Sequence, residues 1–267
     1  MKCNVCDSEM SHEFCEKVLF KYQVNYFRCP ECQLLQTENP HWLNEAYEDA
    51  IVDADTGLIA RNISIAKKVA AVICFQLNKK NQKFLDYAGG YGMFTRMMRD
   101  YGFNFYWSDP YCKNILAKGF EFDESTGQVA LLTAFEVMEH VHEPIPFIEE
   151  CLNKYGVDTI IFSTFLYEGA TPDRNWWYYI FNSGQHITFY TEKTLEVIAS
   201  KLGLYFITAN GIHVFSKKPL NQFVFKILTG RLSFIWSIFI KLTTHSLTMD
   251  DHLRLIAIQN KKGEEIN

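Results

Sequence analysis

The sequence predicts an α/β fold, a doubly wound sheet preceded by a small cysteine-bearing N-terminal segment. Three observations support this prediction. From residue 83 onward, short apolar runs typical of strands alternate with longer amphipathic runs typical of helices. A turn rich in small residues follows the first of these strands. Four of the eight cysteines form two C-x-x-C pairs within the first 32 residues.

Composition narrows the class of protein further. The chain has 267 residues, 48% hydrophobic and 21% charged, which is typical of an ordered globular protein. Its formal net charge of −5 makes a nucleic-acid partner unlikely on electrostatic grounds. No apolar run reaches the ~18 to 20 residues that cross a bilayer, and the first ten residues lack a secretory signal layout. We therefore expect a cytoplasmic protein without a transmembrane segment.

The two cysteine pairs predict a zinc ribbon over residues 1–36. Cys3 and Cys6 form one pair, Cys29 and Cys32 the other, and 22 residues separate the pairs. Two such turns supply the four thiolates that Zn²⁺ takes in structural sites, and a closed sulfur shell leaves no position for catalysis. Alternating apolar and polar residues between the pairs indicate a β-hairpin. The alternative is four unrelated buried thiols.

Two further segments flank or interrupt the main domain, which we expect over residues 83–267. Residues 37–82 are expected to form a helical linker, because apolar residues recur at helical spacing from Leu58 to Ile73. A hydrophobic insertion at about 217–250 carries Phe, Ile and Trp. It predicts an amphipathic helix pair that caps a substrate pocket, forms a homodimer or touches a membrane surface, with the first two favoured.

The turn after the first strand has the features of a nucleotide-binding unit. A strand over residues 83–87 carries Asp86, small residues follow over 88–92, and a helix begins near Met93. Small residues allow a ligand to approach the backbone, and the first helical turn offers unbonded N–H groups. Asp109 follows the next strand, where an acid binds ribose hydroxyls.

The pattern from Asp86 to Gly92, acid-x-small-x-Gly-x-Gly, resembles motif I of the class I S-adenosylmethionine-dependent methyltransferases. Ala88 stands where the first glycine is usual. If this position needs a positive φ, alanine there costs about 1 kcal/mol. A nicotinamide-binding fingerprint fits less well, because Thr95 stands where the third glycine is needed.

The rest of the chain extends this resemblance. Residues 129–144, VALLTAFEVMEHVHEP, look like the fourth strand and following turn of the superfamily. The resemblance implies a seven-stranded, Rossmann-like sheet, and we expect its antiparallel final hairpin from strands near 204–216 and 253–259. With the four cysteines, the layout is similar to sugar methyltransferases of bacterial deoxysugar and surface-polysaccharide pathways.

The resemblance implies roles for individual residues. The amino-acid end of the cofactor is expected at Asp86, Ala88, Gly90 and Gly92, and its ribose at Asp109. Phe135, together with Tyr47, is expected to flank the cofactor. Two alternatives stay open: Asp86 as a cap for nearby backbone amides, and Asp109 as a turn former before Pro110.

Catalysis is expected at Glu139, His140 and His186. The spacing of Glu136, Glu139 and His140 places them on one face if this turn is helical. The Glu-x-x-Glu-His phrase is similar to that of ubiquinone-pathway O-methyltransferases and small-RNA 2′-O-methyltransferases, where these positions and a later histidine hold a divalent ion. The later histidine here is His186, so the resemblance implies Mg²⁺ or Mn²⁺ bound by Glu136, Glu139, His140 and His186. In the sugar methyltransferases, equivalent histidines act as general bases, which is the interpretation we favour. A purely structural pair of histidines is the third alternative.

An aromatic loop precedes His186. It contains Arg174 and four consecutive aromatic residues, 176–179. Exposed aromatic rings suit stacking against a sugar ring, whereas buried ones would form a hydrophobic lid, and both readings stay open.

The sequence therefore predicts transfer of a methyl group from S-adenosylmethionine to oxygen, or less favourably carbon, of a sugar, nucleotide-sugar or surface-polysaccharide intermediate. The acceptor is a small molecule or is glycan-linked. Three alternatives remain: a divalent-metal methyltransferase of a quinone-like acceptor or RNA terminus, a nicotinamide-dependent oxidoreductase, and a non-catalytic zinc-ribbon binding protein.

Overall fold

The structure is a computed structural model that describes residues 1–47 and 55–265. The chain forms two compact units, each assembled from two stretches of sequence. The first unit is Met1–Thr56 with Leu131–Gln222, and the second is Gly57–Ala130 with Phe223–Asn267. Each unit combines stretches that are distant in the sequence. The divisions that we predicted at residues 36 and 82 are therefore not tested by these units and stay predictions.

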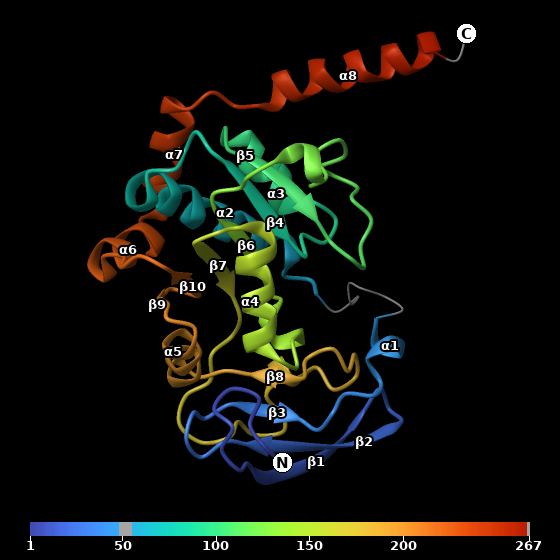
Figure 1. Cartoon of the computed structure of the whole chain (residues 1–267), viewed down its shortest axis with the longest axis vertical. Helices are drawn as coiled ribbons and strands as arrows, with labels where there is room; N and C mark the ends of the chain where they lie inside the picture. Colours follow the sequence, from blue (N-terminus) through green and yellow to red (C-terminus); the bar gives the residue numbers. More distant parts are fainter. Residues whose placement is uncertain (48–54, 266–267) are drawn as a thin grey trace. The chain divides into compact units, whose positions relative to one another are not determined.

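The second unit contains the predicted strand–turn–helix–strand segment (Figure 1). Its strands are parallel, with Asp86 opposite Trp107, and residues at their centres are buried because apolar side chains cover both faces. The helix predicted over 58–73 is also confirmed. The elements are α2 (Leu58–Val72), the π-helical turn η1 (Ile73–Leu77), β4 (Lys83–Tyr87), α3 (Met93–Asp100), β5 (Asn104–Ser108) and the short helix η2 (Glu124–Thr126).

Three more helices of the second unit follow in the sequence. They are α6 (Gln222–Thr229), α7 (Ser233–Thr243) and α8 (Thr248–Glu265). The helix pair predicted for the insertion is confirmed, but the strand predicted over 253–259 is wrong, since these residues belong to α8. Asp250 and Asp251 in the first turn of α8 favour a helix start, which the apolar run by itself did not reveal.

The helices of the described residues are shorter or more polar than a transmembrane helix. None of them is both long and apolar enough to cross a bilayer, whereas α6 and α7 taken together meet the composition but are bent by 84° to one another.

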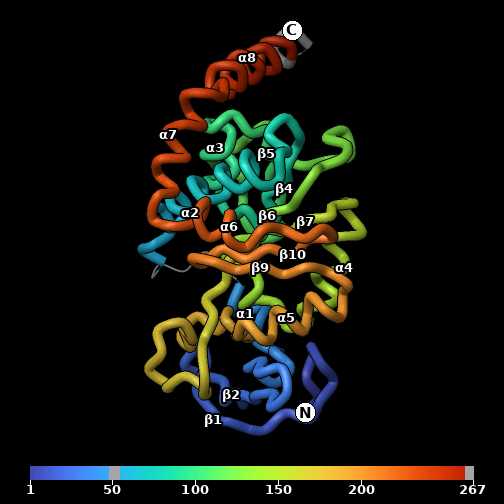
Figure 2. The backbone as a smooth tube through the Cα atoms, turned by 90° about the vertical axis from the view of Figure 1, so that its left-hand side faces the viewer, coloured from blue at the N-terminus to red at the C-terminus, as the bar shows by residue number. Residues whose placement is uncertain are grey.

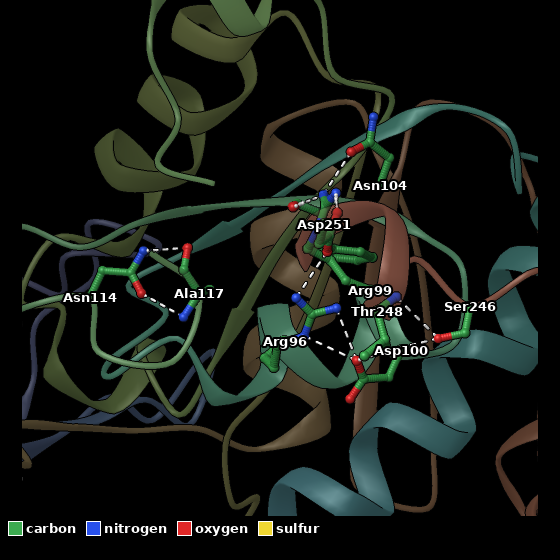
Figure 3. Close-up of polar contacts among 10 residues, drawn as sticks. Arg96, Arg99, Asp100, Asn104, Asn114, Ala117, Ser246, Thr248 and Asp251 are labelled. Atoms are coloured by element: carbon green, nitrogen blue, oxygen red, sulfur yellow. Dashed lines mark hydrogen bonds and ion pairs between the residues drawn. The ribbon is translucent and has the colours of Figure 1, made fainter. Parts of the chain in front are cut away.

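A buried ion pair holds α8 against α3 and β5 (Figure 3). Arg99 donates from Nε and Nη2 to the two carboxylate oxygens of Asp251, at 2.7 and 2.6 Å. Its Nη1 donates to Asn104 Oδ1 at 2.7 Å and to the carbonyl of Phe105 at 2.9 Å. The guanidinium carbon also lies 3.7 Å from the centre of the Phe120 ring. One carboxylate of α8 is thus paired with a buried guanidinium.

The first unit contains four strands of the main, mixed sheet. Their order is β6-β7-β10-β9, where β6 and β7 are parallel and β10 is antiparallel to both neighbours. An antiparallel final hairpin is present, but both of its strands lie within 205–216, joined by Asn210 and Gly211 at positive φ. The elements are β6 (Leu132–Phe135), η3 (Met138–His140), α4 (Pro144–Tyr155), β7 (Thr159–Ser163), α5 (Glu192–Lys201), β9 (Tyr205–Ala209) and β10 (Ile212–Ser216).

These four strands and the β5-β4 pair of the second unit make up a mixed sheet of six strands. The α/β methyltransferase type of sheet is thus present. The seven strands that we predicted are not found among residues 1–47 and 55–265, because the segment expected to supply the last strand is helical.

A second sheet of the first unit is antiparallel, in the order β1-β2-β3-β8 (Figure 1), and its strands β1 and β2 are also labelled in Figure 2. The hairpin predicted between the cysteine pairs is its β1-β2 part. A stacked aromatic core supports it, with the Phe14 and Tyr26 ring centres 4.6 Å apart. Because β3 pairs with β8, the N-terminal segment shares a sheet with residues far along the sequence. The elements are β1 (Ser11–Val18), β2 (Tyr22–Arg28), β3 (Leu35–Thr37), α1 (Leu43–Ala46), η4 (Trp177–Tyr179) and β8 (Thr188–Phe189).

The ion pair that anchors α8 gives a stability prediction. We expect Asp251→Ala to lower the free energy of unfolding by about 3 kcal/mol or more, because it leaves the Arg99 charge buried without its carboxylate. Asp250→Ala is the matched control: that side chain is exposed and pairs only with His245. The control should change stability by less than about 0.5 kcal/mol. Denaturant unfolding measures both, and equal losses would contradict the proposed anchor.

Candidate cofactor and catalytic sites

The turn after β4 is built from residues in the left-handed conformation. Ala88, Gly90 and Gly92 have φ values of 52°, 54° and 84°, all in the left-handed region. A Cβ on Gly89 would lie 2.7 Å from Asp86 Oδ2 and 2.8 Å from Trp107. A side chain is thus excluded at Gly89 and strained at its neighbours. The condition under which we expected strain at Ala88 is met.

Two carboxylates support this turn. Asp86 is almost fully buried at the end of β4 and accepts a hydrogen bond from Thr95 Oγ1 at 2.9 Å. Asp109 is half-buried; its Oδ2 accepts from Gly90 N at 2.9 Å, and its Oδ1 accepts from Tyr111 N and Cys112 N at 2.8 Å. Asp109 therefore forms a turn, as one alternative held. A carboxylate has about four acceptor positions, so one remains for a ribose hydroxyl.

Phe135 lies in the first unit, at the end of β6, and is half-buried. Its expected contact with the cofactor stays a prediction. Tyr47 lies in the same unit, with its ring centre 6.0 Å from that of His140.

Two histidines of the first unit lie close together and make the same kind of hydrogen bond. The ring centres of His140 and His186 are 4.9 Å apart, and the two ring planes are nearly perpendicular. Nδ1 of His140 is 3.0 Å from the carbonyl of Gln185, and Nδ1 of His186 is 2.6 Å from the carbonyl of Tyr178. Each carbonyl can only accept, so each Nδ1 carries a proton and each Nε2 is the basic nitrogen. Burial lowers the pKa of His140 to about 4.

Glu139 completes this cluster and Glu136 does not join it. One ligand atom from each of Glu139, His140 and His186 lies within 4.8 Å of the others, and Glu139 is fully buried. Glu136 has a φ of 54° and precedes η3, and its Oε1 accepts from Ser163 Oγ at 2.5 Å. The helical turn begins only after Glu136, so the condition under which we expected all three side chains on one face is not met.

The aromatic loop divides between the two readings that we left open. Tyr178 and Tyr179 are buried, as in a hydrophobic lid. Trp177 is 64% exposed and lies edge-on to exposed Phe165, with ring centres 5.4 Å apart. Arg174 lies 3.8 Å from Glu16, so it neutralises a carboxylate of the protein.

The four cysteines form two turns of the same geometry. In each turn the first cysteine accepts a backbone hydrogen bond from the fourth residue after it: Asp7 N donates to Cys3 O, and Gln33 N to Cys29 O, both at 3.0 Å. Asp7 and Gln33 both have positive φ, near 65°. The sulfur atoms of Cys3, Cys6, Cys29 and Cys32 all lie within 4.8 Å of one another.

One thiolate is already favoured in this cluster. The sulfur atoms of Cys3 and Cys32 share a hydrogen bond across 3.5 Å, which lowers the pKa of Cys3 to about 5. The same hydrogen bond raises the pKa of Cys32. The cluster is tied to the rest of its unit, since Thr194 Oγ1 donates to the carbonyl of Cys32 at 2.8 Å. Four converging thiols are the donor set that Zn²⁺ prefers.

Some positioning groups were not recognised from the sequence. The carbonyls of Tyr178 and Gln185 orient the histidines, and Trp107 Nε1 donates to the carbonyl of Gly90 at 2.9 Å. Every residue has a backbone carbonyl, so residue type does not reveal which carbonyl will bind a histidine. The only indication in the sequence was that both residues lie near His186. Trp107 had one signal, its place on the strand that precedes Asp109.

Comparisons with known proteins identify the class of enzyme. A family model described as "Methyltransferase domain" matches residues 61–209, more than half of the chain. The chain therefore belongs to this methyltransferase family, and it is an S-adenosylmethionine-dependent methyltransferase. A search among curated proteins gave no match.

Several solved methyltransferase structures are similar to the chain. The small RNA methyltransferase HEN1 is 19% identical with a TM-score of 0.41, over 60% of this chain and 26% of that one. The plantazolicin methyltransferase BpumL, in complex with SAH, is 10% identical with a TM-score of 0.46, over 66% and 94% of the two chains. The magnesium protoporphyrin IX methyltransferase of Synechocystis PCC 6803, with bound SAH, is 13% identical with a TM-score of 0.39, over 66% and 94%.

The glycine turn gives a prediction on cofactor binding. A Cβ on Gly92 would lie 2.6 Å from Asn114 Oδ1 and 3.1 Å from Ala117 N, at a φ of 84°. We therefore expect Gly92→Ala to weaken binding of S-adenosylhomocysteine at least tenfold, measured by calorimetric titration, and to lower stability by about 1–3 kcal/mol.

Ala88→Gly is the matched control within the same turn. It relieves about 1 kcal/mol of left-handed strain and adds a similar entropy to the unfolded chain, so stability should stay nearly constant. S-adenosylhomocysteine affinity should be retained. Unchanged affinity in folded Gly92→Ala protein would contradict the assignment of this turn to the cofactor.

Proposed function

We propose that this methyltransferase transfers the methyl group of S-adenosylmethionine to a hydroxyl of a sugar, a nucleotide-sugar or a glycan-linked acceptor. The observation that carries this proposal is the pair of histidines whose Nδ1 atoms both donate to backbone carbonyls. A hydroxyl needs to lose its proton as it attacks carbon, and a neutral imidazole with a basic Nε2 accepts such a proton. The cofactor supplies a methyl group on a positively charged sulfur.

The protein environment keeps this base in the required form. Because burial lowers the pKa of His140 to about 4, the ring is neutral throughout the physiological range. The fully buried Glu139 is within reach of both rings. Its carboxylate would stabilise the imidazolium that forms when a proton arrives. We therefore assign His140 and His186 as the candidate bases and Glu139 as their electrostatic partner.

The divalent-metal alternative keeps the same three side chains. Two imidazoles and one carboxylate converge, but Glu136 lies outside the group. Mg²⁺ prefers oxygen ligands, so this set suits Mn²⁺ or another transition ion better. Such an ion would lower the pKa of an acceptor hydroxyl. The chain's own residues would then hold the ion rather than accept the proton.

The sugar acceptor is supported by an exposed aromatic pair. Trp177 and Phe165 present ring faces and edges to solvent. Tyr178 links this pair to the bases, because it follows Trp177 and its carbonyl orients His186. Aromatic rings stack against the C–H face of a sugar. A quinone-like ring would also stack there, and an RNA terminus is disfavoured by the net charge of −5.

We also propose a structural Zn²⁺ at Cys3, Cys6, Cys29 and Cys32. Two turns of equal geometry and four sulfur atoms within 4.8 Å support it. Four sulfur ligands close the coordination shell, so the ion would stabilise the first unit rather than take part in methyl transfer. The family match favours methyl transfer over the nicotinamide-dependent and non-catalytic alternatives.

Loss of the proposed bases should abolish turnover without unfolding the protein. We expect His140→Gln and His186→Gln each to lower kcat by about 10²-fold or more in a methyl-transfer assay with nucleotide-sugar acceptors. His213→Gln is the matched control, a buried histidine of the same unit whose pKa is also lowered to about 4 but which bonds to Thr164 and Thr208. Full activity in either folded variant would contradict the base assignment.

Metal removal separates the two mechanisms. After treatment with EDTA and reconstitution with zinc only, a base mechanism predicts unchanged turnover. Turnover that is lost, and then restored by Mn²⁺ or Mg²⁺, would show that the three side chains hold a metal instead.

Elemental analysis tests the structural zinc. We expect one zinc per chain in the purified protein, and its loss in Cys32→Ser together with a lower melting temperature, because the cluster is buried in the first unit. Cys151→Ser is the control, since this thiol is equally buried but lies outside the cluster. Zinc-free wild-type protein with normal stability would overturn the proposal.

A further inference from the structure

The helix α7 exposes most of its large apolar residues. It buries Ser233, Ser237 and Ile240, whereas Phe234, Ile238 and Leu242 are exposed, Leu242 by 80%. A helix that rests on a water-exposed surface normally turns its large apolar residues inward. The outer face of α7 therefore has the chemistry of a surface that contacts an apolar medium.

The inner side of α7 packs within its own unit. α7 contacts α2, whose buried residues are Ile65, Ala66, Val69, Ala70, Ala71 and Val72. This contact covers one side of α7, and the large apolar side chains that remain exposed lie on the side that it leaves open.

The apolar surface extends beyond α7. Phe223 in α6 and Leu232, which follows α6, are exposed. Phe75 of η1 contacts the rings of Trp236 and Phe239 and is itself 41% exposed. The exposed apolar residues of this surface, which we call the apolar face, are Phe75, Phe223, Ile227, Leu232, Phe234, Ile235, Ile238, Phe239 and Leu242.

The charges within the same segment have one sign. Between residues 223 and 249 the sequence contains Lys226, Arg231 and Lys241 and no Asp or Glu, although the chain as a whole has a net charge of −5. All three basic side chains are exposed. Basic residues that flank an apolar surface are complementary to anionic lipid headgroups.

We propose that the apolar face of α6 and α7 binds the surface of an anionic lipid bilayer. The two helices are apolar enough in sum to span a membrane, but the bend of 84° between them points to insertion in the plane of the interface. In this arrangement Phe, Ile and Leu enter the acyl boundary while Lys226, Arg231 and Lys241 contact headgroups. The proposal does not depend on which acceptor is methylated.

A second copy of the chain fits this surface less well. A two-fold symmetric dimer would place the same patch against itself, and it would bring three basic residues of each copy together without an acid from the segment. Like charges opposed in this way are repulsive. An anionic bilayer, by contrast, satisfies both the apolar residues and the basic ones.

The second unit holds this face in place. Thr244 Oγ1 donates to the carbonyl of Tyr101 at 2.8 Å, and Leu247 N donates to the carbonyl of Arg99 at 3.1 Å. Four residues after Leu247, Asp251 forms the buried ion pair with Arg99 (Figure 3). The apolar face is therefore a fixed surface of the folded protein.

Vesicle sedimentation of the full chain tests the proposal. We expect wild-type protein to sediment with vesicles of phosphatidylcholine and phosphatidylglycerol, at least tenfold more tightly than with phosphatidylcholine vesicles, and to be released by salt. The triple variant Ile235→Ser, Ile238→Ser, Leu242→Ser should bind at least tenfold more weakly. Phe20→Asn is its control, because Phe20 is a 69% exposed aromatic residue of the first unit at a positive φ that Asn accepts.

A charge-reversal pair separates local from general electrostatics. Lys226→Glu, Arg231→Glu, Lys241→Glu should lose the preference for phosphatidylglycerol. The control variant Lys17→Glu, Lys154→Glu, Lys193→Glu changes the net charge equally at exposed sites of the first unit and should keep most of that preference.

Two outcomes would overturn the proposal. One is a wild-type protein that ignores anionic vesicles and forms a dimer by analytical ultracentrifugation, with the dimer lost in the triple serine variant, since a second copy then covers the face. The other is a monomer that binds neither vesicle type. Vesicle binding needs no methyl acceptor, so its failure is distinguishable from failure of the proposed methyl transfer.

Discussion

The turn over residues 88–92, with its left-handed residues, is the constraint on which the candidate cofactor site depends. Three residues there have positive φ, and a Cβ at Gly89 would collide with Asp86 and Trp107. Only such a conformation ends β4, starts α3 and brings N–H groups to the surface within five residues. Asp109 accepts a hydrogen bond from Gly90 and thereby joins this turn to the end of β5. The candidate cofactor turn and the parallel pair of strands are thus held together by the same carboxylate.

Backbone geometry also decides the chemistry of the first unit. The carbonyls of Gln185 and Tyr178 fix which nitrogen of each histidine is basic. Two turns that repeat the same hydrogen bonds and the same left-handed residue bring four thiols together. In both clusters the side chains supply reactivity and the main chain supplies orientation. The proposed bases and the proposed zinc ligands therefore lie in one unit but have no residue in common.

The helices after residue 222 show a different balance of forces. Folding buries Ser233 and Ser237 and leaves Phe234 and Leu242 exposed, which costs hydrophobic stabilisation in water. The buried ion pair of Arg99 with Asp251 holds the following helix in place. The unit is thus stabilised by packing and charge on its inner side, while its outer apolar face is complementary to a lipid surface.

The sequence by itself determined whatever depends on neighbouring residues. The spacing of small residues and acids identified the β4-turn-α3 segment, the doubled C-x-x-C identified the thiol cluster, and helical periodicity identified the helix from Leu58. Tertiary structure decided the rest. Residues 253–259 are helical within a helix that a buried carboxylate anchors to Arg99. Glu136 lies outside the Glu139–His140–His186 group, because its backbone is left-handed and it accepts a hydrogen bond from Ser163. Likewise, β8 completes the N-terminal sheet across about 150 residues of sequence. Such outcomes depend on distant partners and on φ values that residue type does not encode, so local patterns could not reveal them.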